Sequence, residues 1–560
     1  MKKTTRTTAS VKASALKGVK STGATTKKKA GPSAQSGEGG LRAAGCQLYW
    51  GDMHSQYKPQ WDREDWDEFL ESAFQEGREN LDFFPIVYYP ALYYTMPEGL
   101  LVESVGWRDE CQGQWEKINA LVKKHHQPGR FVTFAGYEWN GDRTRWGDHN
   151  VFYFDDDQPL DLSLHIDELF RNLRARKAIA IPHHPAYAPG HRSKDWDHHD
   201  ESLSPFVEIF SVHGSSEGDD TPLDMSSNAS MGPRVSGCSV QDGLARGYRF
   251  GIIASNDSGG GLPGRYGSGL MACYARELTR EALWEAFLAR RVYGVTGDRM
   301  RLDFRINGHF MGEVIRAQDP IEVRASVVGT QAIDRIEIVK NNRVVATHCH
   351  NGTWKAPTHG PVRLKVKVEH GWGPLARYGL KAMNKRWESR LETDEARLLS
   401  VERCFTRPGQ RILERSDLRC SYSLVTPSRL DRGGVSNTQS LVFELEGDLS
   451  AKVRLICGEV SASFTLAELL AQSRCLPMSG EVESAIRDQF GLSPAQIENA
   501  DVFYHNAWKI KIHRAAPEAG YTAALHWTDP KPAPGRNFYS ARVGQINGQY
   551  AWSSPIWVDR

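Results

Sequence analysis

Apolar and polar positions alternate at two different spacings along the chain. Up to about residue 300, short apolar runs such as 131–137, 178–182 and 251–255 are separated by amphipathic stretches. The apolar runs predict strands, and the spacing of apolar positions in the amphipathic stretches predicts helices over 66–78, 114–124, 166–177 and 279–291. Strands that alternate with helices predict an α/β fold, with β/α repeats around a mainly parallel sheet or barrel.

Beyond about Arg301 the pattern changes to short segments in which every second residue is apolar. Half-buried antiparallel strands follow this period, and it holds over most of 301–306, 321–327, 333–339 and 362–368. These segments predict a β-sandwich, interrupted by helical insertions at 465–474 and 480–490 and ended by a hairpin of 537–543 and 554–558. We therefore expect an α/β domain over 43–300 and a β-rich accessory domain over 301–560.

Residues 1–42 differ in composition from the rest of the chain. They are rich in Lys, Thr, Ser, Ala and Gly, contain Glu38 as their only acid, and lack the apolar content that a core requires. We expect a disordered basic tail. Its charge suits a weak contact with nucleic acid or an anionic surface, and its acid-poor start resembles a transit peptide. Its poor amphipathic periodicity favours a plain solubilising tail.

The overall composition narrows the class of protein. A net charge of only +2 gives no global field that would attract nucleic acid. Nine cysteines at scattered spacings form no disulfide framework, which fits a reducing cytoplasm. No apolar run approaches the roughly 18 residues that cross a membrane. We expect a soluble cytoplasmic protein without a membrane partner, and make no prediction of its oligomeric state.

Groups that bind metals recur where the predicted strands end. In the segment 49–56, strand alternation places Asp52, His54 and Gln56 on one side. A lone Asp-x-His pair is often only a polar strand-end turn. Here, however, further imidazoles and carboxylates follow or flank later apolar runs, at Glu138, His149, His183, His184, Glu208, His213 and Asp257. Because the carboxyl ends of strands carry the active site in β/α folds, we expect these groups to converge on a metal site.

Several of these stretches together resemble the polymerase-and-histidinol-phosphatase (PHP) superfamily, and specifically a large bacterial branch with a Gly-Asp-Leu-His opening. The resemblance spans roughly Leu48 to Arg560. The matching stretches are Trp50-Gly-Asp-Met-His54, Gly136-Tyr-Glu-Trp139, Gly147-Asp-His-Asn-Val151, Ile181-Pro-His-His-Pro185, Val207-Glu-Ile209, Ile253-Ala-Ser-Asn-Asp257, Glu281 to Asp298 and Tyr550 to Trp557.

The resemblance implies a distorted β/α barrel that holds two or three divalent ions and acts as a phosphoesterase. Carried over by position, His54 is a ligand from the opening motif, and Glu138 is a bridging carboxylate. His149, His184 and Asp257 are ligands from the later motifs. Asp52 matches the opening acid and is either a ligand or an orienter of one.

Three departures from the family pattern reduce the expected number of ions. Gln56 replaces a second opening histidine, Tyr88 and Tyr89 stand where the family has ligands, and Ser258-Gly259 replaces the end of a last Asp-x-His. Amides, phenols and glycine are poor ligands for divalent ions. We expect one or two transition-metal ions, zinc, manganese or iron.

The same residues suggest catalytic groups besides the metal ligands. Tyr88 and Tyr89 are candidates for hydrogen bonding to a substrate, or else they form an aromatic cluster with Tyr93 and Tyr94. Arginine suits phosphate and carboxylate, and candidates to contact an anionic substrate are Arg246, Arg249, Arg265 and Arg299. Of these four we expect Arg299 to be catalytic, together with Asp52, Tyr88 and Tyr89.

The expected function is that of a metal-dependent hydrolase that cleaves a phosphate ester or another small anionic ester. Its nucleophile would be metal-bound water, since a divalent ion lowers the pKa of bound water towards ~7. Two alternatives stay open. One is a lyase that uses the same metal on an oxygenated substrate, and the other is a catalytically reduced binding or scaffold protein.

Overall fold

The computed structural model describes residues 45–560 apart from a set of short stretches. The stretches left out are 58–64, 91–92, 96–100, 104–106, 140, 226–231, 259–260, 318–319, 351–353, 355–357, 375–383, 429–436, 479–486, 489–490 and 500–506. The predicted tail, residues 1–42, and most of the predicted helix 480–490 therefore lie outside the described residues.

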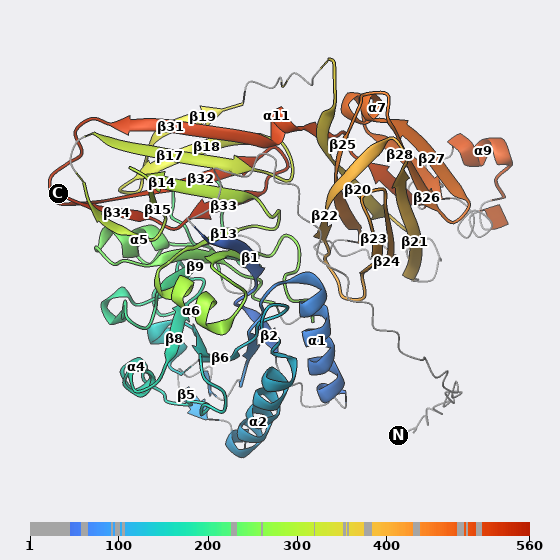
Figure 1. The fold of residues 1–560 in the computed structure, drawn as a ribbon. Coiled ribbons are helices and arrows are strands. Elements are labelled where there is room, and N and C mark those ends of the chain that lie inside the picture. Colours follow the sequence, from blue (N-terminus) through green and yellow to red (C-terminus); the bar gives the residue numbers. More distant parts are fainter. Residues whose placement is uncertain are drawn as a thin grey trace, which may run out of the picture. The chain divides into compact units, whose positions relative to one another are not determined.

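Five short strands form the sheet that begins the α/β region (Figure 1). In sheet order they are β2 (Ser55–Tyr57), β3 (Ile86–Tyr88), β6 (Ala135–Trp139), β7 (His149–Tyr153) and β8 (Ala178–Pro182). Strands β2, β3 and β6 are parallel, whereas β7 pairs antiparallel with both β6 and β8. The amino end of β7 therefore lies at the same sheet edge as the carboxyl ends of β6 and β8.

The four helices predicted in this region are confirmed. They are α1 (Trp66–Asn80), α2 (Trp107–His125), α4 (Ile166–Arg174) and α6 (Arg280–Leu288). In α4, the apolar residues Ile166, Leu169, Phe170 and Leu173 recur at helical spacing and are buried. Helix α6 begins at Thr279, whose side chain accepts a hydrogen bond from the Ala282 amide. Shorter helices are α3 (Arg143–Trp146), η1 (Trp196–His198) and α5 (Val240–Ala245).

Two further sheets continue the α/β region. One contains β10 (Gly214–Ser215), β9 (Phe206–Ser211) and β11 (Gly251–Ala254), with β9 and β11 parallel. The other has nine strands, which are β1 (Gln47–Gly51), β12 (Leu270–Ala275), β13 (Val292–Val295), β33 (Tyr550–Ser553), β32 (Arg536–Gln545), β18 (Ile333–Lys340), β19 (Arg343–Cys349), β34 (Ile556–Asp559) and β16 (Val314–Arg316). Figure 1 shows the blue strand β1 close to β13 and β33.

The predicted barrel is not present as a closed ring among the described strands. The strands before residue 300 are divided among separate sheets. Strand β13 pairs with β12 on one edge, and on the other it pairs with β33 rather than with a strand of the first 300 residues. The nine-stranded sheet therefore crosses the boundary expected at residue 300. What the structure shows is a mixed α/β fold built from several sheets.

The region after residue 300 is rich in strands, as predicted. A four-stranded sheet contains β15 (His309–Phe310), β14 (Arg301–Ile306), β17 (Ile321–Val328) and β31 (Thr522–Asp529). A six-stranded sheet contains β22 (Ala396–Cys404), β25 (Gln439–Gly447), β20 (Val362–Gly371), β29 (Trp508–Ile512), β28 (Arg474–Met478) and β30 (Ala516–Pro517). A five-stranded sheet contains β23 (Arg411–Arg415), β24 (Arg419–Pro427), β21 (Asn384–Thr393), β26 (Lys452–Cys457) and β27 (Val460–Thr465).

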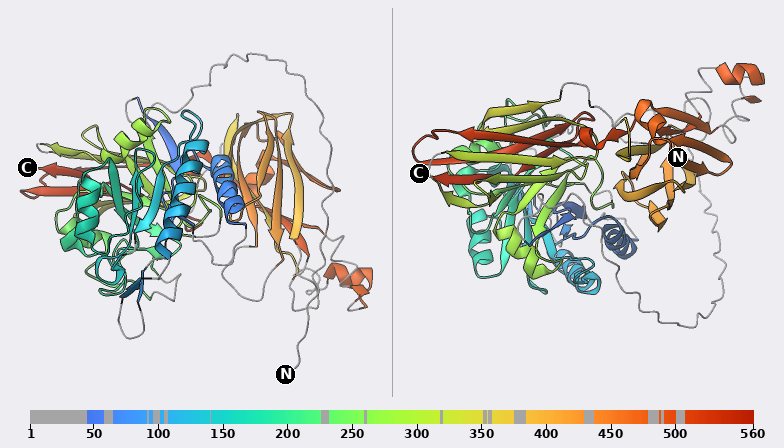
Figure 2. Two further views of the ribbon diagram at one scale, coloured as in Figure 1. Left: turned by 90° about the horizontal axis from the view of Figure 1, so that it is seen from below. Right: turned by 45° about the horizontal axis from the view of Figure 1, so that its top comes forward.

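These last two sheets pack face to face as a β-sandwich, seen in yellow-orange and orange in Figure 2. Every second residue of β20 from Val362 to Val368 is buried in the core that the sheets share. That core includes Trp387 and Tyr422 from the facing sheet and Phe443 from the strand next to β20. The other short elements here are α7 (Leu466–Ala471), α9 (Pro494–Asn499) and α11 (Glu518–Tyr521), and the pair β4 (Tyr93–Thr95) and β5 (Leu101–Glu103) lies in the α/β region.

None of the nine cysteines, all of which are described, forms a disulfide, and Cys349 and Cys475 are the exposed ones. In the described part of the chain, no helix combines the length and the apolar character that crossing a membrane requires.

Candidate metal centre

The ends of six strands bring four imidazoles and four carboxylates together. Four of these groups follow from the sheet edge described above, where β6 and β8 end and β7 begins. The others come from the turn before β2 and from β9, β11 and the loops that follow them. The centre consists of His54, Glu138, Asp148, His183, His184, Glu208, His213 and Asp257, which form overlapping sets of three with ligand atoms within 4.8 Å of one another. All eight side chains are buried.

His54 forms one side of the centre and is oriented by a carboxylate behind it. Its Nδ1 lies 2.9 Å from Glu208 Oε2, while its Nε2 lies 3.3 Å from Asp257 Oδ1 and 3.6 Å from Glu138 Oε2. Burial on its own lowers the pKa of His54, but Asp257 and Glu208 outweigh burial and raise this pKa well above its usual value. A carboxylate on one ring nitrogen fixes which nitrogen faces the centre.

His184 and His213 form the opposite side. His213 Nε2 lies 3.0 Å from Asp257 Oδ2, and His184 Nε2 lies 3.9 Å from the same oxygen. The hydroxyl of Tyr187 lies 2.7 Å from His213 Nδ1, so the tyrosine holds this ring as Glu208 holds His54. Burial lowers the pKa of His184 well below its usual value, which keeps the imidazole neutral. A neutral imidazole is the form that binds a metal.

Local backbone geometry directs neighbouring residues into the centre. The chain leaves the strand conformation at His184, whose φ is +32°. His183 and His184 can therefore both face the centre, although they would point to opposite faces in a strand. Asp257, also a ligand candidate, has a φ of +51°. Positive φ is uncommon outside glycine, and such residues cluster at functional sites.

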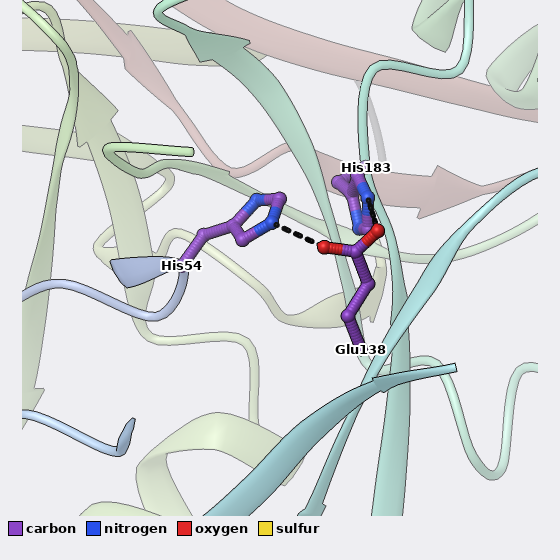
Figure 3. Close-up of side chains that lie close together, drawn as sticks. All are labelled: His54, Glu138 and His183. Carbon is purple, nitrogen blue, oxygen red and sulfur yellow. Dashed lines mark ion pairs between the residues drawn. The ribbon is translucent and has the colours of Figure 1, made fainter. Parts of the chain in front are cut away.

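Buried polar atoms without hydrogen-bond partners indicate that these groups fit a cation. Within the described residues, neither ring nitrogen of His183 has such a partner, and nor does Oε1 of Glu138. Figure 3 shows His54 and His183 on either side of the Glu138 carboxylate, with Glu138 Oε1 3.9 Å from His183 Nε2. Burying such atoms unsatisfied is costly. A divalent ion would satisfy them, and a mixed imidazole and carboxylate set suits zinc, iron or manganese.

Two arginines lie beside the carboxylates. Arg143, in α3, places its Nε 3.2 Å from Asp148 Oδ1. Arg192 donates from its Nε to Asp148 Oδ2 at 2.6 Å, and each arginine has a terminal nitrogen 3.7 Å from Glu138 Oε1. Their side chains are 18% and 25% exposed, whereas the carboxylates are fully buried. The two arginines are therefore more exposed than the carboxylates that they contact.

Of the metal ligands predicted from the sequence, His54, Glu138, His184 and Asp257 come together. Asp52 lies behind them and makes no contact of ligand type. Its carboxylate accepts hydrogen bonds from the amides of His54, Asn256 and Gly264, at 3.0, 3.1 and 2.8 Å. It thus joins the turn that carries His54 to the loop that carries Asp257, which is the orienting role considered for it.

His149 does not join the centre. In the antiparallel pairing of β6 and β7 it lies opposite Trp139, whereas Glu138 lies opposite Asn150. Partners directly opposite each other share a face of the sheet, so His149 projects away from Glu138. Its ring lies 6.0 Å from those of both Trp139 and Phe170. Asp148, one residue earlier, takes the place expected for His149.

The predicted catalytic residues occupy different surroundings. Tyr88 lies beside Tyr137 in the sheet and donates its hydroxyl hydrogen to Gln114 Oε1 of α2, at 2.7 Å, on the face away from the centre. Tyr89 projects to the other face, where Arg143 lies 5.4 Å from its ring. Arg299 lies over the ring of Trp50, and its backbone amide donates to Glu402. No contact of Arg299 with the eight residues is found in the described chain.

Four members of the centre were not among the residues assigned as metal ligands from the family resemblance. They are Asp148, His183, Glu208 and His213. The last three stood out in the sequence as polar residues at strand ends, but nothing there distinguished His183 from His184. Asp148 could be found only once the pairing of β6 and β7 is known, because a ligand on the face of Glu138 must lie at an even offset from Asn150.

The side chains of a second group also lie within ligand distance of one another. This group consists of Asp298, Glu402 and Cys404. Its carboxylates are already satisfied. Asp298 accepts from Tyr266, Gln545 and Asn547, and Glu402 accepts from Thr330 and from the Arg299 amide. The contacts explain this group as a hydrogen-bonded structural cluster.

The chain is similar to several sequences and structures. A family model described as "Protein of unknown function (DUF3604)" matches residues 84–221 and 263–328. An uncharacterized protein of Chlamydia pneumoniae is 25% identical over 327 residues, which are 54% of this chain and 48% of that protein. An uncharacterized protein of Chlamydia trachomatis is 24% identical over 342 residues, 54% of this chain and 49% of that protein. The chain thus spans about half the length of these curated relatives.

A solved structure from Bacteroides vulgatus, a two-domain protein containing a predicted PHP-like metal-dependent phosphoesterase, matches 76% of this chain and 96% of that one. Its sequence identity is 12% and its TM-score is 0.28, so neither fold nor function carries over from it. The family model is more informative about the centre. It covers Glu138, Asp148, His183, His184, Glu208 and His213, and leaves His54 and Asp257 outside its two matched segments.

Proposed function

We propose that this protein is a metal-dependent hydrolase that cleaves a phosphate ester or another small anionic ester. The observation that carries the proposal is the buried cluster of four imidazoles and four carboxylates, with two partly exposed arginines beside it. Groups of this kind are costly to bury unless they serve a bound ion. We also propose that the strand ends surround the ion in a PHP-like arrangement. The convergence of the ligand-bearing strand ends on the centre supports this arrangement.

The first ion would bind to His184, His213 and Asp257. Two imidazoles and one carboxylate leave coordination positions open for water and substrate, as catalytic sites require. The hydrogen bond from Tyr187 to His213 adds support, since outer partners of this kind fix metal ligands. Zinc, manganese and iron all accept this set. A second ion would use Asp148 and His183 with Glu138.

When bound, the ion supplies a Lewis acid and lowers the pKa of bound water towards ~7. The protein's own groups supply the rest. Arg143 and Arg192 neutralise and position an anionic substrate, because planar guanidinium groups match the oxygens of phosphate or carboxylate. Glu138, fully buried between both arginines and His54, keeps those cations in place before the substrate arrives. The face of Tyr89 fixes the direction of Arg143.

Metal content and turnover test the proposal together. Purified protein should contain at least one equivalent of a transition metal by elemental analysis and should hydrolyse at least one member of a panel of aryl and alkyl phosphate mono- and diesters. His183→Gln should lower both. The matched control is His370→Gln, which changes an equally buried histidine in β20 of the sandwich and should lower neither.

Two results would count against the proposal. Wild-type protein that binds no added zinc, manganese or iron would instead favour a binding or scaffold protein. Metal-loaded protein whose product incorporates no oxygen from ¹⁸O-labelled water would favour a lyase that uses the same ion.

A further inference from the structure

Gln56 occupies the middle of one ligand set of the centre. It lies in β2 and is 6% exposed, and its side chain projects between His54, Glu138 and Asp257. Its Nε2 donates to Glu138 Oε2 and, at 3.0 Å, to Asp257 Oδ1, and it lies 3.3 Å from His54 Nε2. A primary amide has two N–H groups. Here both meet carboxylate oxygens that would otherwise face a cation.

His54 Nε2 lies near both carboxylate oxygens that accept from this amide. His54 Nε2 lies 3.3 Å from Asp257 Oδ1 and 3.6 Å from Glu138 Oε2. Figure 3 shows the His54 ring directed at the Glu138 carboxylate. An ion at this point would require the space that the Gln56 amide fills. An amide nitrogen carries no free lone pair and is not a metal ligand.

On the other side of the centre, Tyr187 lies behind His213, and Asp148 lies 3.6 Å from His184 with Arg192 beside it. Asp257 therefore divides its two oxygens between two environments. Oδ1 accepts from the Gln56 amide, and Oδ2 faces His213 and His184.

We infer that Gln56 excludes an ion from the position between His54, Glu138 and Asp257, and so confines metal binding to the side of the centre formed by His183, His184 and His213. The amide replaces the ion as the donor that holds the two carboxylates together. The inference deepens the proposed metal-dependent function, since it assigns the residue that limits the number of ions. Replacing Gln56 with histidine would remove the amide that excludes the ion. It would also surround the ion site with two imidazoles and two carboxylates.

The test compares metal stoichiometry in Gln56→His and Gln56→Ala with that of wild-type protein, using Mn²⁺ and Co²⁺ titrations of the full chain. Gln56→His should bind one equivalent more than wild type. With Mn²⁺ it should also gain the exchange-coupled electron paramagnetic resonance signal of two neighbouring ions. Gln56→Ala removes the amide without adding a ligand, so it should bind the additional ion more weakly than Gln56→His does. Gln112→His makes the same change on the exposed face of α2 and should add none.

Two outcomes would overturn the inference. In the first, Gln56→His gains no ion while circular dichroism shows it folded. In the second, Gln56→Ala loses an equivalent, which would mean that the amide oxygen of Gln56 is itself a ligand. A wild-type protein without metal would defeat the proposed function alone, because Gln56→His would still be expected to bind one ion.

Discussion

At the scale of single residues, the centre depends on groups that do not themselves face an ion. His213 is held through Nδ1 by the Tyr187 hydroxyl, at 2.7 Å, with Nε2 directed at Asp257. His54 is held in the same way by Glu208. If Gln56 excludes an ion beside His54, only the contact of Tyr187 with His213 supports a ligand of a bound metal.

Tyr187→Phe should therefore weaken metal binding by roughly 10–100-fold, the usual effect of losing an outer partner of a metal-bound histidine. The measurement is a competition titration with a chromophoric chelator. Tyr88→Phe is the matched control, because its hydroxyl contacts Gln114 on the opposite face of the sheet and should leave affinity and turnover unchanged. Equal affinities for Tyr187→Phe and wild type would remove His213 from the set of ligands.

How well the sequence predicted the centre also depends on single residues. The convergence of His54, Glu138, His184 and Asp257 could be predicted because polar groups recur at strand ends and because the family resemblance carried these four over by position. His149 could not be assessed in this way, since its direction depends on the pairing of β7 with β6. Pairing is a long-range property, and shifting a strand by one residue exchanges its two faces.

At the scale of elements, β7 shows that the periodicity of apolar residues does not predict the direction of a strand. The apolar run after His149 predicted a strand but not its direction, and the structure reverses it relative to β6 and β8. The helices and the alternating strands after residue 300 were predictable because each depends on local spacing. The absence of a closed barrel was not, because it depends on which distant strand takes the open edge of β13.

Strand β32 also fixes the loop that carries His213. Arg542 donates to Glu337 Oε2 and to Glu217 Oε1, each at 2.6 Å, and all three side chains are buried. Glu217 also accepts from the Trp552 indole, at 2.8 Å. Glu217, four residues after the ligand candidate His213, is thus bound to Arg542 of β32 and Trp552 of β33.

Arg542→Leu should lower the free energy of unfolding by about 3–5 kcal/mol, because it leaves two buried carboxylates without their cation. Urea unfolding followed by tryptophan fluorescence measures the change. Arg536→Leu removes an exposed pair with Asp559 from the same strand and should cost no more than about 1 kcal/mol. Similar losses in the two variants would show that Arg542 contributes no more than an exposed arginine does.

At the scale of the whole molecule, the first 40 residues should be separable from the rest. Their composition lacks the apolar residues that a core requires. Deleting residues 1–40 should leave the melting temperature within about 1 °C and turnover within about twofold of the full chain. Differential scanning fluorimetry and steady-state kinetics measure these two quantities. A clear loss of either would show that the segment contacts the folded protein.

The pairing of β13 with β33 sets an order of events on the ribosome. Strands β1, β12 and β13 emerge early, but the edge of β13 stays open until residues 550–553 have been made. Ser554, which accepts from the Ile252 amide and donates to the Val292 carbonyl, arrives just after them. At about 5–20 residues per second, translation leaves this edge unpaired for tens of seconds. The nascent chain therefore carries an exposed strand edge from about residue 300 until residues 550–553 have been made, and its sheet is completed only then.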